Sequence, residues 1–172
     1  MKYLTAAAIA AAGLFALAGC AKPTDSAAFE KQAKEDVRKF IPAMNAGEVD
    51  TLLEMYAPDA EVMAPGNVRA TGHDAIRALM EKESAGMKAA GVSIALNDDD
   101  KAAASGELGY HSGSYTVKDA SGAVVDSGNY LAVMQRQKDG KWLMIRDTWN
   151  SDRAPPAPAE AEVPAAEAAP AT

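Results

Sequence analysis

The sequence is poor in the residues that form disulfides and metal centres. Its 172 residues contain one cysteine, Cys20, and two histidines. A single cysteine cannot form a disulfide within the chain, and two histidines without a spare cysteine disfavour a zinc site. The three aspartates at 98–100 lack the spacing and glycine of an EF-hand, so we interpret them as a solvated turn. We therefore expect no metal and no other cofactor.

The chain also has fewer positively charged than negatively charged residues. The chain has 17 Lys and Arg against 24 Asp and Glu, a formal net charge of −7. An acidic chain repels phosphate backbones, and no basic patch is interleaved with aromatic residues. We therefore expect no nucleic-acid partner.

Ser112 and Ser114 lack the glycine pattern of a nucleophile elbow, which argues against a serine hydrolase.

The apolar run at residues 4–16 is too short to span a bilayer as a stable helix. It follows Lys2 and fits the apolar region of a secretory signal peptide. The sequence Leu-Ala-Gly-Cys at 17–20 resembles the bacterial lipobox, whose cysteine is diacylated and becomes the mature N-terminus. The resemblance implies a signal peptide at 1–19, a membrane anchor on Cys20 and a tether at 20–25. The alternative is an ordinary signal peptide followed by a chance cysteine.

Ala21 bears on which membrane would hold such a lipoprotein. By similarity to bacterial lipoproteins, an aspartate at this position favours retention in the inner membrane, and Ala21 is not one. We therefore expect the outer membrane, with the protein facing the periplasm. Removal of residues 1–19 would take away Lys2 and make the mature chain one charge more negative.

The C-terminal end has a different composition from the rest of the chain. Of the 20 residues from 153 to 172, 17 are Ala, Pro or Glu. Such a segment cannot bury enough apolar surface to fold. It is predicted to be a disordered tail that is either passive or spans a gap to an envelope partner, and it leaves residues 26–152 as one folded domain.

The pattern between these ends predicts two helices, a short strand, a third helix and then four strands. Apolar residues at helical spacing favour helices over 26–46, 49–56 and 71–87. A short strand is expected at 61–64, a second at 92–97 and a long one at 102–118. A bulge near Gly113 in that long strand would place Tyr110 and Tyr115 on the same side.

Residues 128–152 carry the clearest local signal. Two apolar runs, 130–134 and 142–149, flank Lys-Asp-Gly-Lys at 138–141, and Asp-Gly supplies the positive φ of a tight hairpin. Simple alternation along the second strand puts one carboxylate among large apolar side chains, with Leu143, Ile145, Asp147 and Trp149 on one face.

Four segments together carry a family resemblance: AMNAGEVDTLLEMYAPDAEVMAPG, TGHDAIRALM, GYHSGSYTVKDASG and DGKWLMIRDTWNSD. In this order and spacing they resemble the SnoaL-like, ketosteroid-isomerase-like group of the nuclear-transport-factor-2-like superfamily, over about residues 26–152. The resemblance implies an α+β fold in which a curved antiparallel sheet forms a cone around about three helices and leaves an apolar pocket. Proteins of this fold include enzymes, binding modules and association domains, so the fold does not settle the function.

The residues that serve ketosteroid isomerases do not carry over to this chain. Their oxyanion-donor tyrosine falls on Phe40, their proton-shuttling aspartate on Ala64, and their protonated oxyanion aspartate near Ala132. Because these positions supply neither a general base nor hydrogen-bond donors for an oxyanion, we do not expect ketosteroid isomerase activity.

The resemblance places the 142–149 strand at the pocket, which makes Asp147 the main catalytic candidate. Burial should raise the pKa of its carboxyl group and suit it to acid/base chemistry, with His111 as a second catalytic candidate. The alternative is a structural acceptor that satisfies buried donors. The alternative for His111, which we favour, is a half-exposed strand residue. Besides Asp147 and His111, the predicted pocket residues are Tyr56, Tyr110, Tyr115, Tyr130, Leu143, Ile145 and Trp149.

Three functions remain open from the sequence. The first is an envelope lipoprotein whose single domain binds a small apolar or amphipathic molecule without isomerase chemistry. The second is an enzyme of isomerase, dehydratase or hydrolase type that uses Asp147 on such a molecule. The third is a structural module that forms a homodimer through its sheet.

Overall fold

The computed structural model describes residues 25–153, so the predicted signal peptide, Cys20 and all of the predicted tail except Arg153 lie outside the described residues. Within them the chain forms three helices, α1 (Ser26–Ala46), α2 (Val49–Leu53) and α3 (Gly72–Ala90). It also forms seven strands, which are β1 (Tyr56–Met63), β2 (Ala70–Thr71), β3 (Val92–Leu96), β4 (Lys101–Ser105), β5 (Leu108–Asp119), β6 (Val124–Arg136) and β7 (Trp142–Ser151).

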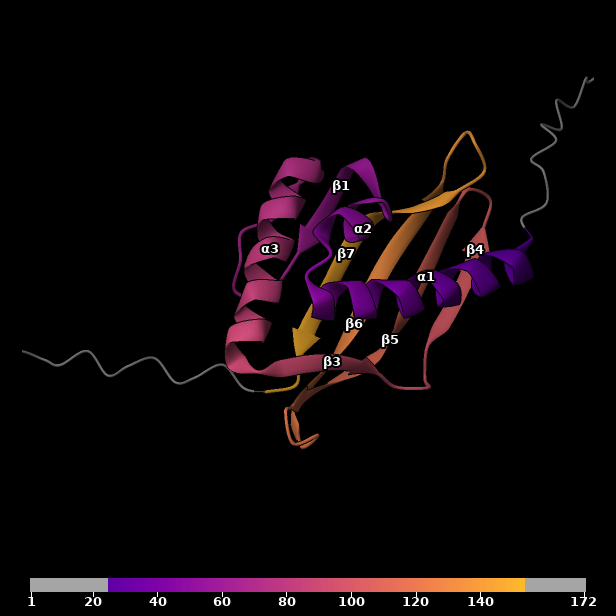
Figure 1. The fold of residues 1–172 in the computed structure, drawn as a ribbon. Helices are drawn as coiled ribbons and strands as arrows, with labels where there is room; N and C mark the ends of the chain where they lie inside the picture. Colours follow the sequence, from indigo (N-terminus) through magenta and orange to yellow (C-terminus); the bar gives the residue numbers. More distant parts are fainter. Residues whose placement is uncertain (1–24, 154–172) are drawn as a thin grey trace, which may run out of the picture.

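All seven strands of this region belong to one sheet with the order β2-β1-β7-β6-β5-β3. β4 and β3 pair with successive parts of β5, and only the pairing of β1 with β7 is parallel. The sheet is curved, α1 crosses its concave face, and α3 packs beside β1 (Figure 1). The predicted α+β class, a curved and mainly antiparallel sheet with three helices, is confirmed.

The two long helices begin and end where the local sequence favours it. The Asp25 side chain accepts a hydrogen bond from the Ala28 N–H at 3.0 Å and caps α1. α1 ends at Ala46 and is capped by Gly47, which has a φ of 74°, a conformation that glycine adopts without a steric penalty. α3 starts after Thr71 and ends at Gly91, which is also left-handed. Both helices therefore fall close to the predicted ranges.

The second predicted helix is wrong at its C-terminal end. α2 stops at Leu53, and Tyr56 already pairs with Met144 as the first residue of β1. The Met144 N–H donates to the Met55 carbonyl at 2.9 Å, so the chain pairs with β7 two residues after the helix ends. Pro58 lies where the β1–β7 register shifts, an irregularity at which the missing N–H is tolerated. Tertiary pairing here outweighs local helical spacing.

The predicted long strand at 102–118 is two strands. The chain reverses at Gly106 and Glu107, and Ser105 then pairs with Leu108. Gly106 has a φ of 63°, which permits this tight reversal. The small residues on either side of the turn give no change in hydrophobic pattern, so the sequence alone did not reveal it.

The core lies between the helices and the concave face of the sheet. Its largest fully buried side chains include Phe29 of α1, Tyr56 of β1 and Ile76 of α3. Phe29 packs against Trp142, with ring centroids 4.5 Å apart, and so fixes α1 on the start of β7. No helix among residues 25–153 is long and apolar enough to cross a membrane.

Candidate functional site

A cavity of about 330 Å³ lies between α1 and the concave face of the sheet. This size is at the lower end of small-molecule sites, and close-packed protein interiors do not leave such a space by default. The predicted apolar pocket is therefore present. Its apolar walls come from α1, α3 and β3, and include Val37, Phe40, Ile41, Met80, Met87, Ile94 and Leu96.

Strands β5, β6 and β7 form the sheet side of the cavity in three cross-strand rows. Each row joins one residue of each strand through the sheet register. In order along the sheet, the rows are His111–Ala132–Asp147, Gly113–Tyr130–Trp149 and Tyr115–Gly128–Ser151. Every row contains one glycine or alanine, and in the first row Ala132 separates the two titratable side chains.

Two glycines of these rows make room for tyrosine rings. A Cβ atom on Gly113 would lie 2.8 Å from the Tyr130 hydroxyl oxygen. One on Gly128 would collide first with the Asn150 backbone carbonyl and would lie 2.6 Å from the Tyr115 hydroxyl oxygen. Neither glycine has a positive φ. Their missing side chains are needed for space: the Tyr130 ring lies over β5, and the Tyr115 ring leans across β6 toward β7.

A β-bulge in β7 decides which of its side chains face the cavity. Met134 pairs with Met144 and Val133 pairs with Arg146, which leaves Ile145 without a cross-strand partner. The bulge reverses the alternation, so Met144, Asp147 and Trp149 line the cavity. The prediction that Leu143 and Ile145 share the pocket face with Asp147 is therefore wrong: neither residue lines the cavity.

Asp147 is buried, with 7% of its surface exposed. The Tyr56 hydroxyl donates to its Oδ2 at 2.5 Å, and the Thr148 N–H also hydrogen-bonds to the carboxylate. Burial raises the pKa of Asp147 from 3.8 to about 6, although these two donors act in the opposite direction. Tyr56 does not line the cavity itself. Its own pKa is raised by burial and by the Asp147 charge, so it remains a hydroxyl donor at neutral pH.

His111 is more deeply placed than the half-exposed alternative suggested. Only 3% of its surface is exposed, and its Nε2 lies 3.2 Å from the Asp100 Oδ2. Burial lowers the pKa of the imidazole, with partial compensation by Asp100. The neighbouring Asp99 accepts hydrogen bonds from the Ser114 N–H and hydroxyl. The predicted solvated turn at 98–100 is present, with Asp98 and Asp99 exposed, and two of its aspartates also hydrogen-bond to β5.

The tyrosines of β5 and β6 divide between the two faces of the sheet. β5 and β6 pair without interruption from Leu108 to Val117, so there is no bulge near Gly113. Tyr110 consequently points to the convex face, with 42% of its surface exposed, and the prediction that it lines the pocket is wrong. Tyr115 and Tyr130 line the cavity. Burial raises the pKa of both, and the buried Tyr130 hydroxyl has no hydrogen-bond partner within residues 25–153.

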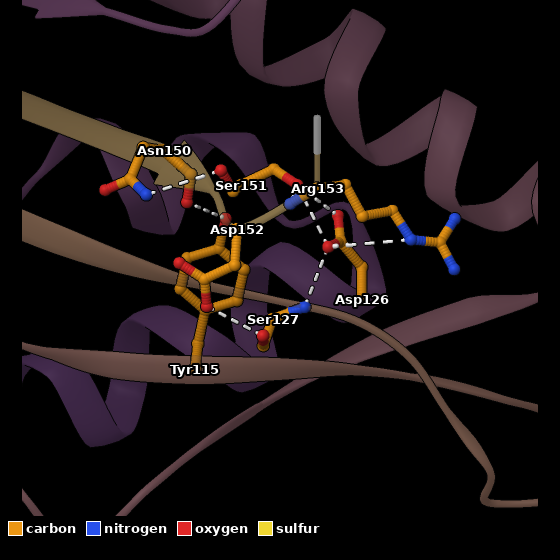
Figure 2. A network of polar contacts seen from close by, with 7 residues as sticks. All are labelled: Tyr115, Asp126, Ser127, Asn150, Ser151, Asp152 and Arg153. Carbon is orange, nitrogen blue, oxygen red and sulfur yellow. Dashed lines mark hydrogen bonds and ion pairs between the residues drawn. The ribbon is translucent and has the colours of Figure 1, made fainter. Parts of the chain in front are cut away.

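One end of the cavity carries a polar network that the sequence did not suggest (Figure 2). The Ser151 hydroxyl lies 2.9 Å from both carboxylate oxygens of Asp126, and Arg153 Nε lies 3.9 Å from the same group. The Tyr115 hydroxyl donates to the Asn150 carbonyl at 3.0 Å. Asp126 and Ser151 line the cavity. They sit on strands whose pairing, and not any motif, brings them together.

The three residues that the family resemblance aligns with the isomerase machinery carry no acid, base or hydroxyl group. Phe40 and Ala132 line the cavity, and Ala64 is buried. Within residues 25–153, no group of three His, Cys, Asp or Glu side chains is arranged to hold a metal ion. Among the titratable groups that line the cavity, Asp147 and His111 are the two that are buried, and they lie in one cross-strand row on either side of Ala132.

The fold and cavity define a class of small α+β proteins with a pocket enclosed by a curved sheet. Residues 37–145 match the SnoaL-like domain family, and the chain belongs to this family. The comparison with curated proteins gave no match.

Solved structures support the same nuclear-transport-factor-2-like fold. The chain is similar to a protein of this type with a cystatin-like fold from Novosphingobium aromaticivorans, with a TM-score of 0.62, 20% identity, and coverage of 72% of this chain and 82% of that one. A second such protein, of unknown function, from Pseudomonas putida gives a TM-score of 0.63 at 18% identity, covering 72% and 87%. A ketosteroid isomerase-like protein from Erwinia carotovora gives 0.53 at 15% identity, covering 70% and 94%. At these identities the likeness concerns the fold alone.

Proposed function

We propose that the protein is an envelope lipoprotein whose SnoaL-like domain binds a small apolar or amphipathic molecule in the cavity between α1 and the sheet. The single observation that carries the proposal is the cavity itself, which is mostly apolar and holds a few convergent polar groups at its wall. Ligand sites in proteins commonly have this composition.

Two substitutions on neighbouring residues of β6 test the binding function. Ala132 lines the cavity between His111 and Asp147, whereas Leu131 points to the convex face and is 42% exposed. Ala132→Phe should fill the cavity, and Leu131→Phe should not. We expect mass spectrometry of molecules extracted from the purified protein to show a ligand with the wild type and Leu131→Phe, and to lose it with Ala132→Phe. Equal recovery from all three would contradict the proposal.

An enzymatic function is the second candidate, because the pKa of Asp147 is raised to about 6 and His111 lies across the same row. A carboxyl group with such a pKa can exchange protons near neutral pH. Molecules extracted from Asp147→Asn protein would be added to the wild type and followed by mass spectrometry. A pH-dependent mass or isomer change would support catalysis, and unchanged molecules would support binding alone.

The membrane anchor is a separate part of the proposal. It rests on the Leu-Ala-Gly-Cys sequence at 17–20 after an apolar run. Several buried acyl chains, at about 0.8 kcal/mol per CH₂ group, would hold the protein on a membrane. Metabolic palmitate labelling should tag the wild type and not Cys20→Ser. Equal labelling would exclude lipidation at this residue.

A homodimer is the third candidate, and the convex face of the sheet favours it. Leu108, Tyr110 and Leu131 are each more than 40% exposed on this face. Contiguous exposed apolar side chains commonly mark an interaction site. Sedimentation equilibrium should show a dimer that Leu131→Lys converts to a monomer. A wild-type monomer at all concentrations would exclude this candidate.

A further inference from the structure

The charge of the cavity wall limits the ligands that it can accept, and this inference rests on the proposed binding function. Among the lining residues there are four carboxylates, Asp36, Glu83, Asp126 and Asp147, and there is no lysine or arginine. An anionic ligand would therefore meet carboxylates of the same sign, with no lysine or arginine among the described lining residues to attract it. The wall favours a neutral or a positively charged molecule.

The four carboxylates differ in their partners. Asp36 lies 4.0 Å from Lys39 Nζ, and Asp126 lies 3.9 Å from Arg153 Nε. Glu83 accepts a hydrogen bond from the Asn67 amide at 3.2 Å on a partly exposed part of α3. Asp147 is the buried member of the set, and its donors, the Tyr56 hydroxyl and the Thr148 N–H, are both neutral. It is thus a buried carboxylate at a cavity wall whose donors supply no positive charge.

A buried charge without a counter-charge is costly, and proteins ordinarily pair it. We propose that the cavity binds cationic amphiphiles, molecules with a small apolar body and an amine, and that the ligand's ammonium group pairs with Asp147. The apolar body would occupy the space enclosed by α1, α3 and β3. A carboxylate on the same apolar body is disfavoured by the Asp147 charge that already faces the cavity.

The pairing predicts a pH dependence of defined direction. Ammonium binding requires ionised Asp147, so affinity should be constant above the Asp147 pKa of about 6 and fall as the pH drops through it. The groups that share the cavity with Asp147 are Tyr115 and His111 from β5, Tyr130 and Asp126 from β6, Asp36 from α1 and Glu83 from α3, with Tyr56 from β1 as its donor. Protonation of His111 at low pH would add a positive charge and weaken ammonium binding in the same direction.

Isothermal titration calorimetry of the purified full chain with octylammonium, 1-octanol and octanoate tests the proposal. At pH 8 we expect octylammonium to bind about ten- to a hundredfold more tightly than octanol, the range of one charge-assisted hydrogen bond. Octanoate should bind more weakly than octanol. Between pH 8 and pH 5 the octylammonium affinity should fall about tenfold, because a group one pH unit below its pKa is about one-tenth ionised.

A matched pair of variants assigns the preference to Asp147. Asp147→Asn should lower the affinity for octylammonium to that for octanol and remove most of its pH dependence. Asp59 is an exposed residue of β1, and Asp59→Asn changes the net charge equally. This control variant should keep the preference for octylammonium and its pH dependence. Circular dichroism would show that each variant is folded. If Asp147→Asn does not fold, the affinities of the wild type for the three probes at two pH values still decide whether the cavity prefers a cation.

The outcomes separate this inference from the function on which it rests. Equal binding of all three probes, or preferential binding of octanoate, would overturn the charge preference while leaving a ligand-binding cavity in place. If none of the probes binds and no co-purifying molecule is found, the binding function itself fails.

Discussion

Two of the carboxylates that line the cavity, Asp126 and Asp147, differ in burial and in the charge of their partners. Asp126, at one end of it, is surrounded by the Ser151 hydroxyl, the Ser127 N–H and the Arg153 guanidinium. Asp147, on the wall between β1 and β6, has the Tyr56 hydroxyl and a backbone N–H. Only Asp147 is buried without a cationic side chain among its partners. The difference shows that sharing a cavity does not give two acids the same chemistry, because solvent access and partners decide it.

The largest effect expected from this comparison is a pH-dependent stability difference between the wild type and Asp147→Asn. The folded-state pKa of Asp147 is raised above that of an unfolded chain, so its ionisation destabilises the fold as the pH rises from about 4 to about 6. The wild type should therefore lose about 2–3 kcal/mol relative to Asp147→Asn between pH 4 and pH 7.5.

Urea unfolding of both proteins at the two pH values measures this difference and cancels the contributions of other acids. Asp99 and Asp119, whose pKa values are lowered by hydrogen bonds, titrate alike in both proteins. A stability difference that does not change with pH would show that Asp147 is solvated or paired in solution.

The two tyrosine hydroxyls near these carboxylates should differ by a smaller amount. Tyr56→Phe removes the donor to the buried Asp147 charge and should cost about 1.5–3 kcal/mol of unfolding free energy at pH 7.5. Tyr115→Phe removes a neutral hydrogen bond to the Asn150 carbonyl and should cost about 0.5–1.5 kcal/mol. At pH 4 the two costs should converge, since Asp147 is then protonated. Equal costs at pH 7.5 would remove the distinction between the two sites.

The smallest effect is expected at the partner of Asp126. Arg153 is 68% exposed at 3.9 Å from that carboxylate, and exposed ion pairs contribute about 0–1 kcal/mol. Arg153→Ala should lower the unfolding free energy by less than about 0.5 kcal/mol in 0.15 M salt. A loss of several kcal/mol would mean that Arg153 closes the end of the cavity in a way that this ion pair does not describe.

The sequence predicted the parts of the fold that depend on local rules. The range of α1, the start of α3 and the hairpin at Asp139-Gly140 follow from apolar spacing and from the backbone preferences of single residues. Asp147 was also found correctly as a carboxylate facing the pocket, but for a wrong reason. The prediction used a simple alternation that placed Asp147 on one face with Leu143 and Ile145. The bulge breaks this alternation, and no single residue of β7 predicts the bulge.

The remaining differences arise from contacts between distant segments. Tyr56 was assigned to a helix because its helical spacing is good, yet pairing with Met144 makes it a strand residue and the donor to Asp147. Asp126 and Ser151 lie 25 residues apart and meet through the pairing of β6 with β7. The register of the sheet fixes such neighbours, and local pattern does not reveal it. Gly113 and Gly128 were interpreted as sources of curvature or left unexplained, whereas they make space for tyrosine rings.

The fit of Tyr130 over Gly113 makes these two positions energetically coupled. A side chain on Gly113 would collide with the tyrosine ring and not with backbone, so the collision can be relieved by a smaller residue at position 130. Substitutions at the two positions should therefore be strongly non-additive: each single change is harmful, and the double change recovers part of the loss. In related proteins, the volumes at these two positions would be expected to vary in opposite directions, and with them the shape of the cavity.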